Sequence, residues 1–439
     1  MADRRTNQLL SVLSTTFGIA VVVGGTIGQG IMRTPGIVAQ GAPRPDVMLG
    51  LWAAGGLIVL VDAMSSIELA ASIRRSGGPF SFATRAFGPL AGLAIGLTDW
   101  LGNTAAIAYI GVVFAEYCHR LGIASDVPIG LLAASLPLAT GAIHWFGTRV
   151  GGTSQEIGSA AKALVYAVLI LALLLVPGTT AAPRAAAPVS AAGLIVAIRA
   201  IVGAYGGWNT AVYFAEEMTD PRRAIARATF SGILAIAAVY LLMNVAILRA
   251  LTPAEMAGSN LVAADAAARV FGAAPGVADR VVTVVSLVSV ATLGNVMVMQ
   301  FPRVLFAIAR DAGAPVLSSV ARNGTPRASL VVTAGVAALL ASVGIYDLLL
   351  AFSLSLVTAM AIAVNVAAIV LRVREPELDR PYRMPLFPLP ALFAMIVNTA
   401  LLIAFIYDDA RTAGLAFLLL AALTTVAYLA VWTGSHRAA

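Results

Sequence analysis

Charged side chains are scarce in this 439-residue chain, at 11% of residues, and cysteine occurs only once. A soluble domain of ordinary composition carries roughly 25% charged residues. The 60% hydrophobic content cannot be hidden in a water-soluble core. The scarcity of charge therefore excludes a soluble protein and predicts an integral membrane protein with many spans. The single cysteine, Cys118, excludes an intramolecular disulfide.

Signatures of catalysis and of ATP use are also missing. No Gly-x-x-x-x-Gly-Lys-Ser/Thr phosphate loop occurs. The acids Asp62, Glu68, Asp99 and Glu116 lie in the first three predicted spans, and none has an obvious partner. We therefore expect no enzyme activity, no cofactor and no metal site. A membrane-embedded enzyme is kept as a distant alternative.

Apolar windows of about 20 residues, the length that crosses a bilayer as a helix, occur twelve times along the chain. They cover residues 14–41, 46–73, 88–118, 127–147, 154–177, 190–218, 223–250, 277–308, 327–344, 346–371, 386–407 and 412–433. We therefore predict an all-α integral membrane protein with twelve transmembrane helices. The long 251–276 connection is expected to contain short helices outside the membrane.

Arginine is concentrated in alternate loops, with clusters at Arg4–Arg5, Arg74–Arg75, Arg222–Arg223 and Arg372–Arg383. Cytoplasmic loops of membrane proteins carry an excess of Lys and Arg. These loops are therefore predicted to face the cytoplasm, and an even number of spans then places both termini there. The net charge of +7 is interpreted as a topology signal of a multi-pass cell-membrane protein surrounded by lipid, with no nucleic-acid partner.

Two predicted spans carry glycine clusters at mid-depth. The run Gly24-Gly25-Thr26-Ile27-Gly28-Gln29-Gly30 interrupts the first span, and Gly203-Ala204-Tyr205-Gly206-Gly207-Trp208 interrupts the sixth. A helix unwinds at membrane depth only inside protein or beside a wet cavity. Such interruptions at matching positions of two halves point to a transporter's substrate site. Close helix packing is the alternative, because Gly24 and Gly28 have small-xxx-small spacing.

The two broken spans each open a unit of five spans, and an odd number of spans gives the units opposite orientation. We predict a LeuT-type 5+5 inverted repeat with helices 1 and 6 broken and two extra C-terminal helices. The expected division is residues 1–13 as cytoplasmic N-terminus, 14–185 and 186–375 as the repeats, and 376–439 as helices 11–12 with the cytoplasmic C-terminus.

Four stretches carry a resemblance to a known family. They are Gly24–Met32 followed by Pro35-Gly36, Glu68-Leu69-Ala70 with Arg75–Phe80, Tyr205–Asn209 followed by Glu216-Glu217 and Asp220-Pro221, and Arg372–Pro385. In this order and at these separations the chain resembles the amino acid–polyamine–organocation (APC) transporters, particularly their L-type amino-acid branch. The resemblance implies sodium-independent transport of amino acids by alternating access, as exchanger or proton symporter.

A broken helix provides both halves of an amino-acid site. Free N–H groups at the start of the resumed helix attract the carboxylate, and free carbonyls at the end of the preceding one attract the ammonium. The predicted carboxylate-binding residues are Gly28, Gln29 and Gly30. The predicted ammonium-binding residues are Gly25, Thr26, Gly203, Ala204 and Tyr205. Trp208 either closes over the substrate or packs.

Lys162 lies within an apolar run of the fifth predicted span. Intramembrane charge is expensive, which makes it a functional hypothesis by default. In sodium-independent relatives a fifth-helix lysine occupies the place of sodium beside the broken first helix, and Lys162 matches that position. It is also a candidate proton carrier, and the alternative is a lysine that snorkels to the interface.

Several further charged and polar residues have more than one possible role. Glu216 and Glu217, followed by Arg222 and Arg223, either form inner-face ion pairs with them or are ordinary surface charges, and the same two alternatives apply to Glu68 beside Arg74 and Arg75. Ser286, Ser289 and Asn295 either line the cavity or join helices, and Arg33 either steers a carboxylate or pairs with Glu116. No acid is evident on the cavity segments, which favours neutral substrates over polyamines or other amines. A channel is the remaining alternative.

Overall fold

The computed structural model describes residues 9–28, 30–175, 189–259, 261–271 and 275–437, and this part of the chain is helical with no β-strand. Its first half contains α1 (Thr15–Thr26), α2 (Gly30–Gly41), α3 (Pro45–Ser72), α4 (Pro79–Phe87), α5 (Pro89–Arg120), α6 (Ile129–Trp145) and α7 (Thr148–Leu175). Proline opens α3, α4 and α5, where its missing N–H and fixed φ suit the first helical turn.

The second half begins with another interrupted helix. It contains α8 (Ala191–Ala204), the 3₁₀-helix η2 (Trp208–Phe214), α9 (Pro221–Ala250), α10 (Pro253–Ala257), α11 (Val262–Phe271), α12 (Pro275–Gln300), α13 (Pro302–Asp311), α14 (Arg327–Ser342), α15 (Tyr346–Arg374), α16 (Leu389–Asp408) and α17 (Ala410–Arg437). The short helices expected between residues 251 and 276 are α10 and α11. The nine-residue α4 was not predicted from the sequence.

Each of the twelve predicted windows is occupied by helix in the described chain. Nine helices there are long and apolar enough to cross a membrane, and the bent pair α1 and α2 makes ten. The shorter apolar helices α6 and α14 lie where the fourth and ninth spans are predicted. The structure is therefore an all-helical, multi-pass membrane protein, and twelve crossings in a 5+5 repeat stay a prediction. The predicted boundary between the repeats, at residues 185 and 186, falls outside the described residues.

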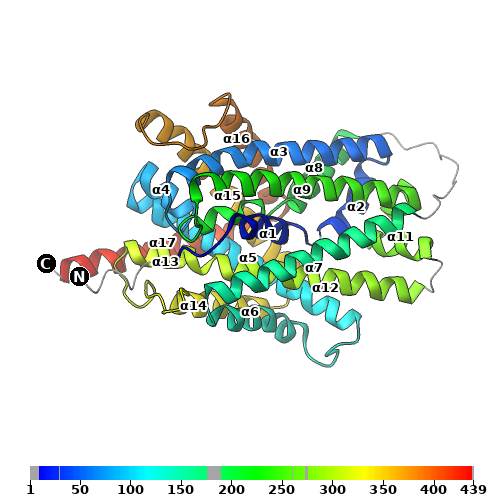
Figure 1. The fold of residues 1–439 in the computed structure, drawn as a ribbon, viewed down its shortest axis with the longest axis horizontal. Helices are drawn as coiled ribbons and strands as arrows, with labels where there is room; N and C mark the ends of the chain where they lie inside the picture. The colour runs from blue at the N-terminus through cyan, green and yellow to red at the C-terminus, as the bar shows by residue number, and fades with distance from the viewer. Residues whose placement is uncertain (1–8, 29, 176–188, 260, 272–274, 438–439) are drawn as a thin grey trace.

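The long helices run side by side, and α1 lies in the middle of the bundle (Figure 1). It contacts α7, α9, α12 and η2, while α2 packs against α8. The two interrupted helices are thus brought together at the centre. The interruption of each one is surrounded by helices from both halves of the chain, which is the arrangement that a wet or ligand-filled interruption requires.

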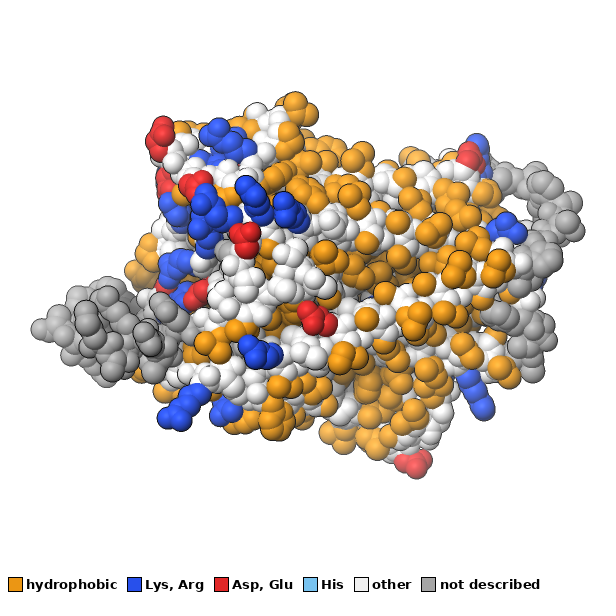
Figure 2. Space-filling model, in the orientation of Figure 1, with side chains coloured by type: hydrophobic (Ala, Val, Ile, Leu, Met, Phe, Trp, Pro, Cys, Tyr) orange, Lys and Arg blue, Asp and Glu red, His pale blue; other side chains and the backbone are white. Residues whose placement is uncertain are grey.

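Basic side chains gather toward one end of the bundle, over α4 and the loop that leads into α16 (Figure 2). Exposed members include Arg74, Arg85 and Arg222. The first described residues and the C-terminal end of α17 lie toward this same end (Figure 1). The described residues nearest the two termini therefore lie toward the Arg-rich end of the molecule, and a cytoplasmic location of that end stays a prediction.

Candidate substrate site

The first interruption follows a well-formed helix. The Ser14 hydroxyl accepts a hydrogen bond from the Phe17 N–H at 3.0 Å and so caps α1. The helix ends at Thr26, Ile27 is extended, and α2 begins at Gly30 at an angle of 48° to α1. Gln29, one of the predicted carboxylate-binding residues, lies outside the described residues.

Lys162 of α7 is the only lysine in the chain, and its ammonium lies directly against this interruption. Its Nζ donates to the carbonyl oxygens of Gly24 at 2.8 Å and Ile27 at 2.5 Å, and the side chain is 1% exposed. Carbonyls released from helical hydrogen bonding are thereby satisfied by a buried charge. The snorkelling alternative is wrong, because a snorkelling ammonium would reach the interface.

Two hydroxyls support the same backbone segment. Ser289 of α12 donates to the Ile27 carbonyl at 3.1 Å, and Tyr166 of α7 donates to the Gly28 carbonyl at 3.2 Å. Ser289 therefore joins α12 to the interruption, which agrees both with a position beside the cavity and with a role in joining helices. Tyr166 was missed by the sequence reasoning, although it stands four residues after Lys162 and so shares its helix face.

The second interruption is built differently. The turn that follows α8 ends at Gly207, whose φ of +100° suits glycine, and η2 begins at Trp208. A Cβ atom at Gly207 would lie 2.0 Å from the Gly25 carbonyl oxygen. Gly30 also lies close to Ala204, since a Cβ there would lie 3.0 Å from the Ala204 Cβ. The two interruptions are therefore in direct contact, and at Gly207 only glycine allows the two backbones to approach this closely.

Tyr240 of α9 bridges the two interruptions. Its hydroxyl lies 3.2 Å from the Thr26 carbonyl oxygen and 2.7 Å from the Ala204 carbonyl oxygen. A phenol has one proton to donate, so one of these carbonyls accepts it at a time. Tyr205 points away from the interruptions, because its hydroxyl donates to the Trp52 carbonyl at 3.2 Å and its ring is fully buried.

Space is available beside the second interruption. Gly203 and Gly206 are exposed, and a Cβ at Gly203 would meet nothing within 4 Å. The Thr26 hydroxyl is buried and lacks a hydrogen-bond partner among the described residues. Trp208 is half-buried and packs against the core. The predicted residues that can be described are thus gathered at one place, with open volume at Gly203 and an unused hydroxyl at Thr26.

The Arg-rich side of the site is closed by two ion pairs. Glu217 is fully buried and accepts from Arg303 of α13 at 2.9 and 3.0 Å, while Arg303 itself is 2% exposed. Glu216 accepts from Arg310 at 2.9 Å and from the Ser76 N–H at 3.0 Å. Burial opposes ionisation of Glu216, but the hydrogen bonds and charge of Arg310 outweigh it and lower the pKa of Glu216.

The N-terminal segment joins this closure. The backbone N–H groups of Val12 and Leu13 donate to the Glu217 carbonyl at 3.0 and 2.9 Å, and the Thr219 N–H donates to the Leu13 carbonyl at 3.0 Å. We call Glu216, Glu217, Arg303 and Arg310 the inner latch. Its side chains tie the segment leaving η2 to α13, and the backbone hydrogen bonds tie that segment to the chain entering α1.

The partners predicted for these acids are wrong. Arg222 instead pairs with Asp379, because α9 carries it outward past the acids that precede it. Glu68 pairs with Arg372 at 2.7 Å and Arg380 at 3.2 Å rather than with Arg74 and Arg75. Both errors arise because neighbours in sequence were preferred over residues that the fold brings in from distant helices.

Arg33 is exposed and lies within electrostatic range of Glu116 on α5, without a direct ion pair in the described structure. Asn295 donates to Gln155 of α7 at 2.8 Å and so joins two helices. Ser286 is buried, and its hydroxyl has no hydrogen-bond partner among the described residues.

Interrupted helices that lie beside each other inside a helical membrane protein are a feature of many secondary transporters. A family model described as Amino acid permease matches residues 10–431. The chain therefore belongs to the amino acid permease family, within the APC superfamily, as the four sequence stretches indicate.

Three relatives show what kinds of protein the chain is similar to. The serine/threonine exchanger SteT of Bacillus subtilis is 25% identical over 94% of this chain and 95% of its own length. The b(0,+)-type amino acid transporter 1 of Homo sapiens is 28% identical over 90% of this chain and 82% of its own. The large neutral amino acids transporter small subunit 2 of Oryctolagus cuniculus is 30% identical, over 84% and 71% respectively. The family and these relatives are transporters rather than enzymes.

Proposed function

We propose that this chain is a sodium-independent secondary transporter that carries amino acids, preferably neutral ones, across the cell membrane by alternating access. The observation that carries the proposal is Lys162, the only lysine of the chain, buried against the first interruption. Its ammonium donates hydrogen bonds to two backbone carbonyls and places a positive charge beside them. A bound sodium ion would neutralise the same carbonyls. A carrier with this built-in cation needs no sodium to keep the interruption open.

The substrate site of this proposal lies between the two interruptions. The α-carboxylate binds the N–H groups of Gly28, Gln29 and Gly30 at the start of α2, where the helix dipole is positive. The α-ammonium binds carbonyls near Gly25, Thr26, Gly203, Ala204 and Tyr205. The Tyr240 hydroxyl lies within hydrogen-bond distance of the Thr26 and Ala204 carbonyls. An ammonium bound there either displaces this hydroxyl or binds the carbonyls together with it.

The side chain of the substrate occupies the open volume beside Gly203. Trp208 is the first residue after the turn of the second interruption. Two of the relatives are named a serine/threonine exchanger and a large neutral amino acids transporter, which supports a preference for neutral substrates. Alternating access consists of breaking the inner latch while the opposite side closes. The Arg-rich end is cytoplasmic in this proposal, so the latched conformation excludes the cytoplasm from the site.

Uptake by purified protein in proteoliposomes tests the proposal. Labelled serine, threonine, leucine, lysine and putrescine are each offered with sodium or with choline, and with or without unlabelled substrate inside. We expect saturable uptake of neutral amino acids, stimulated by internal substrate and equal in the two salts. A strict sodium requirement contradicts the assignment of Lys162, putrescine as the best substrate contradicts the amino-acid assignment, and flux without saturation or counterflow indicates a channel.

A further inference from the structure

Asp62 is an acidic residue inside the membrane that the substrate site does not use. It lies on α3, ten residues before the end of that helix at Ser72, which is about 15 Å at 1.5 Å per residue. No Lys, Arg or His of the described chain forms an ion pair with it. An intramembrane carboxylate is expensive to keep, so one without a cationic partner calls for a function.

Two amides hold this carboxylate. Asp62 Oδ1 accepts hydrogen bonds from Asn365 Nδ2 of α15 at 3.0 Å and from Asn398 Nδ2 of α16 at 3.1 Å. Each amide nitrogen also donates to the carbonyl one turn earlier, of Ala361 and Ala394, at 3.0 Å. The Ser65 hydroxyl donates to Asn365 Oδ1 at 2.6 Å, which fixes that amide with its nitrogen toward Asp62.

This environment selects the kind of ligand. Hard metal cations need several oxygen ligands, whereas two N–H donors point at Asp62. The donors stabilise the ionised carboxylate through charge-assisted hydrogen bonds. A proton is the cation that a carboxylate surrounded by N–H donors can still accept, and it needs no additional oxygen ligands.

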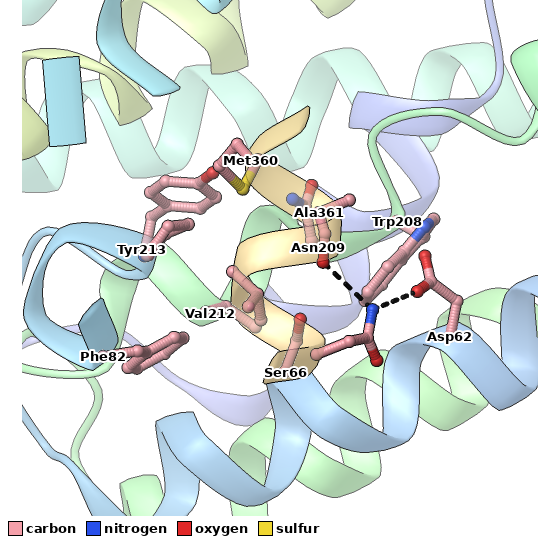
Figure 3. Close-up of a pocket in the computed structure, with 12 residues that line it drawn as sticks. Asp62, Ser66, Phe82, Trp208, Asn209, Val212, Tyr213, Met360 and Ala361 are labelled. Carbon is pink, nitrogen blue, oxygen red and sulfur yellow. Dashed lines mark hydrogen bonds between the residues drawn. The ribbon is translucent and has the colours of Figure 1, made fainter. Parts of the chain in front are cut away.

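A small cavity borders Asp62. It measures about 30 Å³ and is bordered by Asp62, Asn365, Trp208, Asn209 and Tyr213, together with apolar residues of α4 and α15 (Figure 3). That volume suits one or two waters and is far too small for an amino acid. Trp208 and Asn209 open η2 directly after the second interruption. The carboxylate and the segment that follows the second interruption therefore border the same small space.

Other titratable groups around this space are already engaged. Tyr213 of η2 donates its hydroxyl proton to Asp99 of α5 at 2.8 Å, and Glu68 of α3 is paired with Arg372 and Arg380. The remaining lining from α4 and α15 includes Pro79, Phe82, Met360 and Val364, and α16 contributes the Asn398 amide. Asp62 is therefore the group on this cavity whose protonation changes the net charge.

We propose that Asp62 is a proton-binding site that couples substrate transport to the proton gradient. This inference rests on the proposed function. A proton from water in the cavity binds a carboxylate oxygen, no other bond breaks, and the charge becomes zero. Neutralisation weakens the hydrogen bonds that tie α15 and α16 to α3, the helix that packs against η2. The proton then leaves on the side to which the cavity next opens.

The test separates proton-driven accumulation from exchange. Wild-type protein, Asp62→Asn, Asp62→Glu and Asp46→Asn are placed in proteoliposomes. Asp46 is the control, because it lies on the same helix but forms an exposed pair with Arg44. Each variant is assayed for counterflow without a gradient, for accumulation under a gradient of one pH unit, alkaline inside, and for proton entry with an entrapped pH-sensitive dye.

We expect wild type and Asp46→Asn to accumulate substrate up to about tenfold, the limit for one proton and one pH unit. Asp62→Asn, which keeps the shape of the protonated acid, should still exchange substrate but should neither accumulate it nor admit protons. Asp62→Glu should restore accumulation in part. Absence of counterflow in wild type would contradict the proposed function itself, and the coupling proposal would fall with it.

Four results overturn the coupling proposal while leaving transport by the wild type intact. Wild type that exchanges but ignores the gradient shows that no proton is coupled. Accumulation by Asp62→Asn equal to wild type moves the proton to another group, of which Lys162 is the first candidate. Equal loss of exchange and accumulation in folded Asp62→Asn shows a purely structural role, and a change in selectivity for lysine over leucine shows side-chain recognition.

Discussion

The two helix interruptions meet at one point but are supported in different ways. The first is held by a buried ammonium and two hydroxyls from α7 and α12, all donating to its carbonyls. The second is shaped by its own glycine turn, shares Tyr240 with the first, and leaves Gly203 and Gly206 exposed. We infer that the first interruption is a fixed half of the site and the second is the half that adapts to substrate and moves.

The largest loss of stability and transport should come from a substitution that forces the backbones of the two interruptions apart. Gly207→Ala places a Cβ 2.0 Å from the Gly25 carbonyl at a φ of +100°, and we expect destabilisation above about 4 kcal/mol with no transport. Gly122→Ala is the control, since Gly122 has a φ of +76° but no neighbour within 4 Å. Thermal unfolding in detergent measures both variants. Equal losses would assign the effect to backbone strain and not to contact between the interruptions.

Removal of the Lys162 ammonium should have the second-largest effect. Lys162→Ala deletes two charge-assisted hydrogen bonds worth about 1.5–3 kcal/mol each, so we expect substrate affinity to fall by at least about 100-fold. Binding is measured by scintillation proximity on folded protein. Ser154→Ala, on the same helix and outside the site, is the control. An affinity within about threefold of wild type would show that Lys162 does not hold the first interruption in its substrate-binding conformation.

The adaptable half should respond in selectivity rather than in folding. Gly203→Phe fills open space beside the second interruption, so large substrates should lose about tenfold relative to small ones, as for a crowded apolar pocket. The ratio of leucine to serine uptake measures this change, and unfolding temperature should stay unchanged. An unchanged ratio would place the substrate side chain elsewhere.

The smallest effect should come from the residue that both halves share. Tyr240→Phe removes one neutral hydrogen bond worth about 1 kcal/mol, which corresponds to about a fivefold loss of transport. The ring remains packed against Trp52 and Tyr205. Phe230→Leu tests ring loss on the same helix at a site away from the interruptions. A loss as large as that of Lys162→Ala would contradict the division into a fixed and an adaptable half.

Local patterns in the sequence predicted most of the architecture. Apolar windows located every long helix, and glycine clusters located both interruptions, because each is a property of one segment. Lys162 could be singled out because a charge in an apolar run is visible locally. Tyr166, Tyr240 and Arg303 were not identified, since a tyrosine or arginine gains its role only from the distant carbonyl or carboxylate that it meets.

The same limit explains the incorrect ion pairs. Glu217 stands five residues before Arg222 in the sequence, but its partner Arg303 comes from α13, 86 residues away. Asp62 and Asn365 are 303 residues apart, and nothing in either segment alone indicates that they meet. Pairings between helices follow from packing, which the hydropathy pattern does not specify.

A chain with a single, fully buried lysine also carries its own chemical reporter. Amine-directed reagents should find no reactive lysine in the latched protein, because Lys162 is enclosed beside the first interruption. Its rate of acylation would then record how often that interruption is exposed to water. Substrate or pH that changes this rate would be detected by mass spectrometry at one peptide, without any engineered label.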